Sequence, residues 1–272
     1  MKFADLHLHT VFSDGTSTPQ ELIDTAKKSG LSAVSIVDHD TVLGIEPALK
    51  AGKEKNIEVL PGIELTAEYD GLEIHILGYL VDYKNGQLLE KLQYLRKNRI
   101  ERIYKIVDKL KEQGIKIDPE TILSRVSNQG TAGRLHVART MVKEGLVNSV
   151  FEAFQKYIGD KCPAYVLNFK LSPQESIELI KAAGGIPVLA HPYILKRDDL
   201  IPVFADSGLM GLEAYYTEHS QSMVNSYLEL AKRYNLLVTG GSDYHGDAKP
   251  EVKMGAVKIP YELVERLKEA KK

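Results

Sequence analysis

Short apolar runs alternate with amphipathic stretches over much of the chain. The apolar runs are bounded by Gly, Pro, Asp or His, which is typical of buried strands. They lie at residues 3–9, 33–38, 58–64, 73–81, 186–190, 211–215, 236–239 and 255–259. Helical patterns occupy residues 19–29, 45–55, 173–183, 200–205, 220–234 and 261–270. This alternation predicts parallel strands with helices outside them, and therefore an α/β barrel.

Two of the predicted helices begin with a complete N-terminal signal. Thr18 and Ser172 each precede a proline, and Glu21 and Glu175 stand three residues after them. The hydroxyl can accept from free N–H groups of the first turn, proline suits the first helical position, and the glutamate completes a capping box. We therefore expect helices to begin at residues 19 and 173.

The middle of the chain interrupts the alternation. Between about residues 88 and 110 the apolar positions follow a helical period, and further helical patterns lie at 119–126, 135–144 and 150–158. We predict a helical insertion at residues 96–165, between a first part of the barrel at 1–95 and a second part at 166–272. No repeat or flexible linker interrupts these segments, so the insertion is expected to pack on the barrel.

Composition agrees with a single globular chain of this kind. The 272 residues are 43% hydrophobic and 26% charged, enough for one barrel of roughly 250 residues with an insertion. The net charge of −2 argues against a protein that coats duplex nucleic acid. A small phosphorylated ligand is still possible, because one pocket can be positive while the whole chain is not.

The chain has one cysteine and no long apolar segment. Cys162 alone cannot form an intramolecular disulfide, and a cysteine-ligated metal site is excluded. No stretch approaches the roughly 20 apolar residues of a membrane span, and no secretory pattern opens the chain. We expect a cytoplasmic protein that does not associate with membranes. The sequence does not indicate its oligomeric state.

Histidines and acids gather where predicted strands end. Six of the eight histidines lie in an apolar run or in the turn that follows one, together with three acids: His7, His9, Asp14, His39, Glu64, His75, His191, Asp243 and His245. In an α/β barrel the carboxyl ends of the strands share one face, so residues far apart in sequence can meet there. Imidazole and carboxylate groups without thiolate suit Zn, Mn or Fe better than Ca.

Taken together, these segments resemble the polymerase and histidinol phosphatase (PHP) superfamily of metal-dependent phosphoesterases. Within it, the chain looks most like the bacterial branch of nucleoside 3′,5′-bisphosphate phosphatases and 5′-to-3′ exoribonucleases that act on short RNA. The resemblance covers nearly the whole chain and rests on Asp5-Leu6-His7-Leu8-His9, Asp14-Gly15, Asp38-His39-Asp40, Gly62-Ile63-Glu64, His75-Ile76-Leu77-Gly78, Gly133-Arg134-Leu135-His136, Ala190-His191-Pro192 and Gly240-Gly241-Ser242-Asp243-Tyr244-His245-Gly246.

The resemblance implies a distorted (β/α)7 barrel that holds two or three divalent ions, Mn, Zn or Fe. By position, the first ion would be held by His7, His9, Glu64 and Asp243. The second would share Glu64 and add His75 and His191, and the third would be held by Asp14, His39 and His245. No ligand position is missing. One of the two acids beside His39 is expected to orient it.

A cluster of divalent ions favours phosphate ester hydrolysis, because the ions lower the pKa of bound water towards about 7 and hold the phosphoryl oxygens. Positive charge outside the cluster would select a second phosphate, and Arg134 is the first candidate, His136 the second. His219 is expected to protonate the leaving oxygen or to bind substrate. We interpret the basic run at 96–105 as a solvated helix face.

Three functions are compatible with these patterns. The favoured one is hydrolysis of a small nucleotide, a nucleoside 3′,5′-bisphosphate, or of the 5′ end of short RNA. The second is histidinol-phosphate phosphatase, which predicts an acidic group in the pocket and has no need of Arg134. The third is a non-catalytic, metal-stabilised module that binds a nucleotide or a protein.

Overall fold

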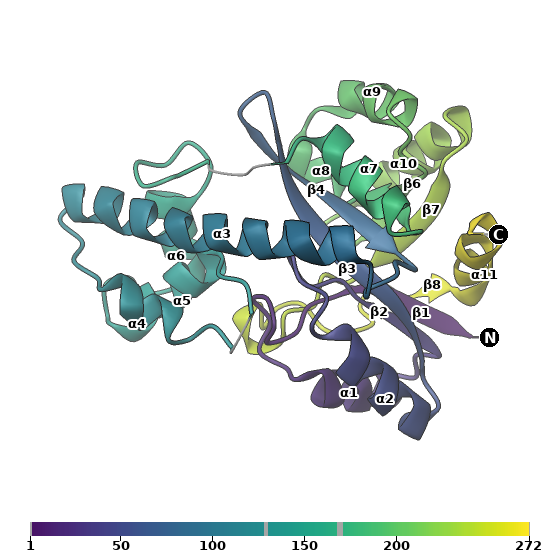
Figure 1. Ribbon diagram of the computed structural model, residues 1–272, viewed down its shortest axis with the longest axis horizontal. Helices are drawn as coiled ribbons and strands as arrows, with labels where there is room; N and C mark the ends of the chain where they lie inside the picture. The colour runs from purple at the N-terminus through teal and green to yellow at the C-terminus, as the bar shows by residue number, and fades with distance from the viewer. Residues whose placement is uncertain (1, 128–129, 168–170, 272) are drawn as a thin grey trace.

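A single sheet curls into a nearly closed barrel in the computed structural model, which describes residues 2–127, 130–167 and 171–271 (Figure 1). The strands are β1 (Phe3–Leu8), β2 (Ala33–Ile36), β3 (Glu58–Tyr69), β4 (Leu72–Tyr79), β5 (Ile186–Leu189), β6 (Gly211–Tyr216), β7 (Leu237–Gly241) and β8 (Ile259–Pro260). Their order in the sheet is β7-β6-β5-β4-β3-β2-β1-β8. The predicted distorted seven-stranded α/β barrel is confirmed, with the two-residue β8 added at its edge.

One strand runs against the prediction of a parallel barrel. β1, β2 and β3 pair in parallel, as do β5, β6 and β7, but β4 is antiparallel to both of its neighbours. Only Asp70 and Gly71 separate β3 from β4, and both have positive φ, 50° and 76°. A parallel return needs a crossover of a dozen or more residues. A two-residue Asp-Gly turn can make only a hairpin.

The barrel closes between β1 and the segment that follows β7. Leu8 pairs in parallel with Tyr244, and the His9 N–H donates to the Tyr244 carbonyl over 3.0 Å. β8 pairs antiparallel with the other end of β1, and the predicted strand at 255–259 is reduced to it. This closure places the His7–His9 segment directly beside the residues that follow β7.

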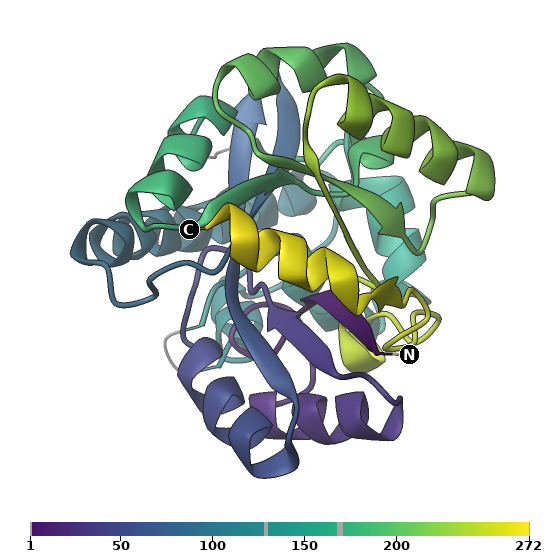
Figure 2. The same ribbon diagram turned by 90° about the vertical axis from the view of Figure 1, so that its right-hand side faces the viewer.

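Helices surround the barrel and cover one of its ends. They are α1 (Pro19–Lys28), α2 (Ile45–Lys55), α3 (Gly86–Glu112), α4 (Pro119–Leu123), α5 (Arg134–Lys143), α6 (Val150–Ala153), the π-helical turn η1 (Phe154–Ile158), α7 (Pro173–Ala182), α8 (Pro192–Leu195), the 3-10 turn η2 (Asp198–Leu200), α9 (Ile201–Asp206), α10 (Gln221–Arg233), the 3-10 turn η3 (Gly246–Ala248) and α11 (Tyr261–Ala270). The capping boxes at Thr18 and Ser172 are confirmed. Figure 2 shows α11 in front of the strands at the end where both termini emerge. None of the described helices is long and apolar enough to span a membrane.

The long helix α3 links two hydrophobic cores. Leu88, Leu92 and Leu95 in its first half pack with the barrel strands and α7. Its second half joins a separate cluster with residues of α4, α5 and α6, which Figure 1 shows to one side of the barrel. Residues 164–166 form no strand, and Ala164 and Val166 belong to this second cluster. The division at residues 96 and 165 stays a prediction.

Candidate metal centre and substrate cavity

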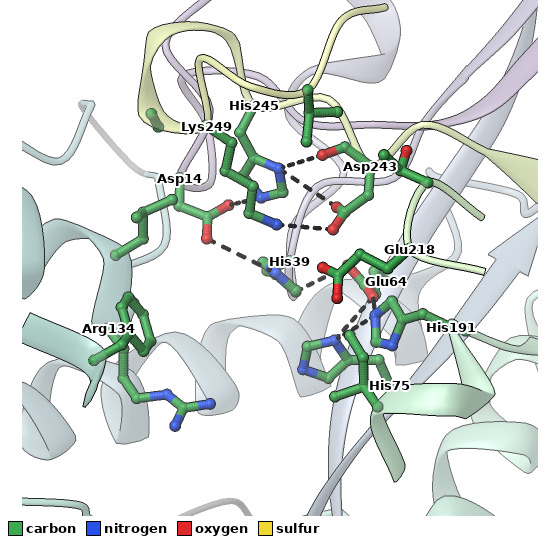
Figure 3. A pocket seen from close by; sticks show the side chains of 18 of the residues that line it. Asp14, His39, Glu64, His75, Arg134, His191, Glu218, Asp243, His245 and Lys249 are labelled. Carbon is green, nitrogen blue, oxygen red and sulfur yellow. Dashed lines mark hydrogen bonds and ion pairs between the residues drawn. The ribbon is translucent and has the colours of Figure 1, made fainter. Parts of the chain in front are cut away.

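The nine predicted ligands lie around the floor of one cavity of about 1050 Å³. Seven of them line it, and Figure 3 shows their side chains turned toward one another. The other two, His7 and His9, lie just beneath and are completely buried. Strand ends and the turns after them supply these side chains, because the barrel brings those segments to one face.

The donor atoms of these residues form four overlapping groups, and within each group they lie within 4.8 Å of one another. The groups are His9, Asp14, His39 and His245; His7, His9 and Asp243; His7, Glu64 and His191; and His39, Glu64 and His75. Four residues occur in two groups each, so neighbouring cation sites would share ligands. The division among ions that the resemblance implies stays a prediction.

Glu64 lies at the centre of the cluster and is 1% exposed. Its Oε1 is 2.9 Å from His75 Nδ1 and 3.2 Å from His191 Nε2. Its Oε2 is 3.2–3.5 Å from ring nitrogens of three further histidines, His7, His9 and His39. A carboxylate with both oxygens facing imidazoles can bridge two cations.

Outer carboxylates hold two of the imidazoles in place. His7 Nδ1 is 2.8 Å from Glu213 Oε1, and His75 Nε2 is 3.1 Å from Glu73 Oε1. An ionised carboxylate only accepts, so in each pair the imidazole N–H donates and the opposite ring nitrogen faces the cluster, where it can bind a cation once it has lost its proton. This arrangement is common behind metal-ligating histidines.

The two oxygens of Asp243 face different surroundings. Oδ2 accepts from the Tyr216 hydroxyl over 3.0 Å and from Lys249 Nζ over 2.8 Å. Oδ1 faces the cluster, 3.4 Å from His7 Nε2 and 3.3 Å from His9 Nε2. One oxygen is therefore fixed by the protein, and the other is free to act as a ligand.

Several buried donor and acceptor atoms of the cluster lack a hydrogen-bond partner. They are His7 Nε2, His9 Nε2, Asp14 Oδ1 and His39 Nδ1. Burying polar atoms without partners is costly, and the four residues that carry these atoms all belong to the groups described above. Nitrogen and oxygen donors without thiolate suit Zn, Mn or Fe. The residues thus fit divalent cations both by geometry and by chemistry.

The electrostatics of the cluster also favour cations. Burial alone would raise the pKa of the Glu64 and Asp243 carboxyls. Neighbouring imidazoles hold the pKa of Glu64 well below the usual range, and Lys249 together with imidazoles does the same for Asp243. Burial acts to lower the pKa of His9 and His75, yet the adjacent acids raise it to about 9 and about 10. Cations would replace these protons, so metal binding should weaken as the pH falls.

Three arginines form a basic wall beside the cluster: Arg99, Arg102 and Arg134 all line the cavity. Arg102 Nη2 and Arg134 Nη2 both donate to Glu73 Oε2, over 3.1 and 2.9 Å. Arg99 Nε donates to Asp40 Oδ2 over 2.6 Å. The interpretation of residues 96–105 as a solvated face is wrong at Arg99 and Arg102, which are 6% and 3% exposed, because α3 turns them toward the barrel.

The acids beside His39 support other segments of the site. Asp38 accepts from Thr10 and Ser13, and the Ser13 hydroxyl oxygen lies 3.4 Å from His9 Nδ1. Asp38 therefore braces the loop behind His9. Asp40, the other acid beside His39, accepts from the Arg99 guanidinium.

The three residues predicted to contact substrate or leaving group lie in different places. Arg134 reaches the cavity, and Figure 3 shows it across from the strand-end histidines. His136 is buried and accepts from the Gly133 N–H over 3.2 Å, and burial lowers its pKa to about 4. His219 Nδ1 lies 2.9 Å from the Ala214 carbonyl oxygen. Among the described residues, the cavity lining includes neither His136 nor His219.

Besides Arg99 and Arg102, sequence reasoning missed three charged residues of the site. Glu213 had a readable signal, since it is an acid inside the apolar run at 211–215. Glu73 had the same signal, because it stands between Leu72 and Ile74 in the apolar run at 73–81. Lys249 lies in a polar segment, and only its long-range partner Asp243 reveals it.

Comparison with known proteins places the chain in one family. The family model for the PHP domain matches residues 5–117. A 5′-3′ exoribonuclease of Haemophilus influenzae is 32% identical over 246 residues, 89% of each chain. A 3′,5′-nucleoside bisphosphate phosphatase of Chromobacterium violaceum is 31% identical over 89% of this chain and 86% of its own. The crystal structure of a candidate metal-dependent phosphoesterase from Bifidobacterium adolescentis has a TM-score of 0.90, with 33% identity over 97% of this chain and 94% of its own.

Proposed function

The chain belongs to the PHP family and is a hydrolase of phosphoric esters, and we propose that it cleaves a nucleoside 3′,5′-bisphosphate or the 5′ end of short RNA. The observation that carries this proposal is the meeting of two features in one cavity, the histidine–carboxylate cluster and the arginine wall. The cluster suits a reacting phosphate, and the wall suits a second phosphate on the same molecule.

We assign two or three divalent ions, Mn, Zn or Fe, to the cluster. The proposed ligands are His7, His9, Glu64 and Asp243 for the first, Glu64, His75 and His191 for the second, and Asp14, His39 and His245 for the third. When bound, such ions lower the pKa of water and hold the phosphoryl oxygens. The buried acids stay ionised, and the outer carboxylates keep the inward ring nitrogens of His7 and His75 aimed at the cluster.

The arginine wall favours a substrate with two anionic groups. The Arg134 guanidinium has a planar fork of donors that matches phosphate oxygens, and its side chain is 16% exposed. Its two Nη atoms contact Glu73 and Asp160, so a phosphate would compete with these carboxylates. Histidinol phosphate would bring an ammonium group instead, to which a guanidinium group offers no acceptor. A nucleoside bisphosphate or a short RNA is therefore the better match.

Replacing Arg134 with alanine tests this choice. We expect kcat/KM for adenosine 3′,5′-bisphosphate to fall roughly 10- to 100-fold, because a charged hydrogen bond contributes about 1.5–3 kcal/mol. Arg134→Ala should cleave histidinol phosphate at least as well as the wild type does. The measurement is a substrate panel on metal-loaded protein, with dinucleotides and short RNA included.

The matched control is Arg125→Ala, which removes a guanidinium paired with Glu144 in the insertion, outside the described cavity lining. Nucleotide cleavage that is undiminished in Arg134→Ala would contradict the assignment. A wild type that prefers histidinol phosphate would favour the alternative function.

Glu213 is a positioning residue for two proposed ligands, and Glu213→Gln should weaken metal binding. Its oxygens face the N–H groups of two partners, the His7 ring at 2.8 Å and the His191 backbone at 2.7 Å. Glutamine offers one acceptor and one donor, so one contact must be lost. We expect divalent-ion affinity, measured by calorimetric titration, to fall about 10- to 100-fold.

A purely structural role would change a different quantity. If Glu213→Gln lowered the melting temperature of the metal-free protein while its metal affinity matched the wild type, the positioning role would be wrong. Glu68→Gln, on β3 and outside the described cavity lining, serves as the control.

A further inference from the structure

The mouth of the cavity carries two exposed apolar side chains. Phe151 is 73% exposed, the highest value among the large hydrophobic residues that the structure describes, and Ile194 is 48% exposed. Single exposed apolar residues are ordinary on protein surfaces. These two, however, line the same cavity as the candidate metal centre.

The two side chains come from different parts of the fold. Phe151 belongs to α6 in the insertion, and Ile194 to α8, which follows β5 of the barrel. Figure 1 shows α6 and α8 in these separate parts of the molecule. Both residues border the one cavity, so a flat ligand entering it would meet apolar surface from each part.

The apolar mouth is continuous with the basic wall. Phe151 and Phe154 are three residues apart in the continuous helical segment of α6 and η1, so their side chains lie on the same face. The Arg134 guanidinium carbon lies 5.7 Å from the centre of the Phe154 ring. The exposed Phe151 therefore lies one helical turn from the aromatic ring that the Arg134 guanidinium contacts.

We propose that Phe151 and Ile194 form a base platform, on which the nucleobase of the substrate stacks while Arg134 takes a phosphate. The inference rests on the proposed function and adds a determinant of specificity to it. Every base has a flat π face, so such a platform tolerates any base. Purines should bind best because their larger π face covers more of the Phe151 ring.

The test compares two substrates that differ only by the base, adenosine 3′,5′-bisphosphate and 1-deoxyribose 3,5-bisphosphate. The quantity measured is the ratio of their kcat/KM values on metal-loaded protein. Phe151→Ala should lower this ratio about tenfold, at the lower end of what stacking on an aromatic side chain contributes. Phe151→Trp should restore it. Tyr94→Ala removes an exposed aromatic of α3 outside the described cavity lining and should leave the ratio as in the wild type.

Two outcomes would overturn the base platform. One is an equal ratio in Phe151→Ala and the wild type. The other is a lower molecular mass of Phe151→Ala by light scattering, which would make Phe151 part of an interface between copies of the chain. If the wild type cleaves neither compound, the proposed function fails. Calorimetric binding of the same two compounds to the same variants then decides the platform independently.

Discussion

Glu64→Gln is expected to lower kcat/KM at least a thousandfold and to reduce the number of divalent ions bound per chain. Both oxygens of this carboxylate face imidazole nitrogens, and it belongs to two of the four groups of candidate ligands. The amide has one acceptor oxygen, no charge, and an NH₂ group that would face the metal-binding nitrogens. A thousandfold loss corresponds to about 4 kcal/mol of transition-state stabilisation. Steady-state kinetics and elemental analysis of the purified variant measure the two effects.

The control for this variant is again Glu68→Gln, four residues further along β3, with a side chain outside the described cavity lining. It should keep the wild-type metal content and activity. If Glu64→Gln bound as many ions as the wild type and kept its activity within about tenfold, the central role of Glu64 would be contradicted.

Much of the fold could be predicted because its signals are local. The capping boxes at Thr18 and Ser172 involve residues only three positions apart. The Asp70-Gly71 turn is also a local signal, because two residues of this type between extended runs strongly favour a hairpin. The parallel direction assigned to β4 therefore neglected information that the chain contains. The alternation of strands and helices was correctly interpreted, but this turn was not.

The positions of the proposed ligands followed from the strand ends, because barrel topology decides where those ends meet. Arg134 was predicted from its segment, but Arg99 and Arg102, the other two arginines of the wall, could not be found in this way. A hydrophobic pattern counts Arg99 and Arg102 as polar, so their burial on α3 conflicts with it. Their partners, Asp40 and Glu73, are 59 and 29 residues away in sequence. Such pairs depend on how α3 packs against the barrel, which no local spacing reveals.

Removal of divalent ions is expected to abolish hydrolysis and to lower the melting temperature. When the free ion concentration is about 100 times the dissociation constant of a site, binding there stabilises the folded chain by about 2.7 kcal/mol. For a chain of this size that is a shift of roughly 5–10 °C for each independent site. The measurement is thermal unfolding of chelator-treated protein before and after reloading with Mn, Zn or Fe, with activity followed in parallel.

The rise in melting temperature on metal binding should depend on pH, and this dependence distinguishes ions bound at the cluster from ions bound on the surface. In the folded, metal-free protein the adjacent acids raise the pKa of His9 to about 9 and that of His75 to about 10. Both rings are therefore positively charged at neutral pH, with a proton on each nitrogen. Metal binding must release these protons, and the shift should therefore grow between about pH 6.5 and 8.5. Glu64→Gln should show a smaller shift at every pH. A shift that is equal in Glu64→Gln and the wild type, or that decreases as the pH rises, would place the ions elsewhere.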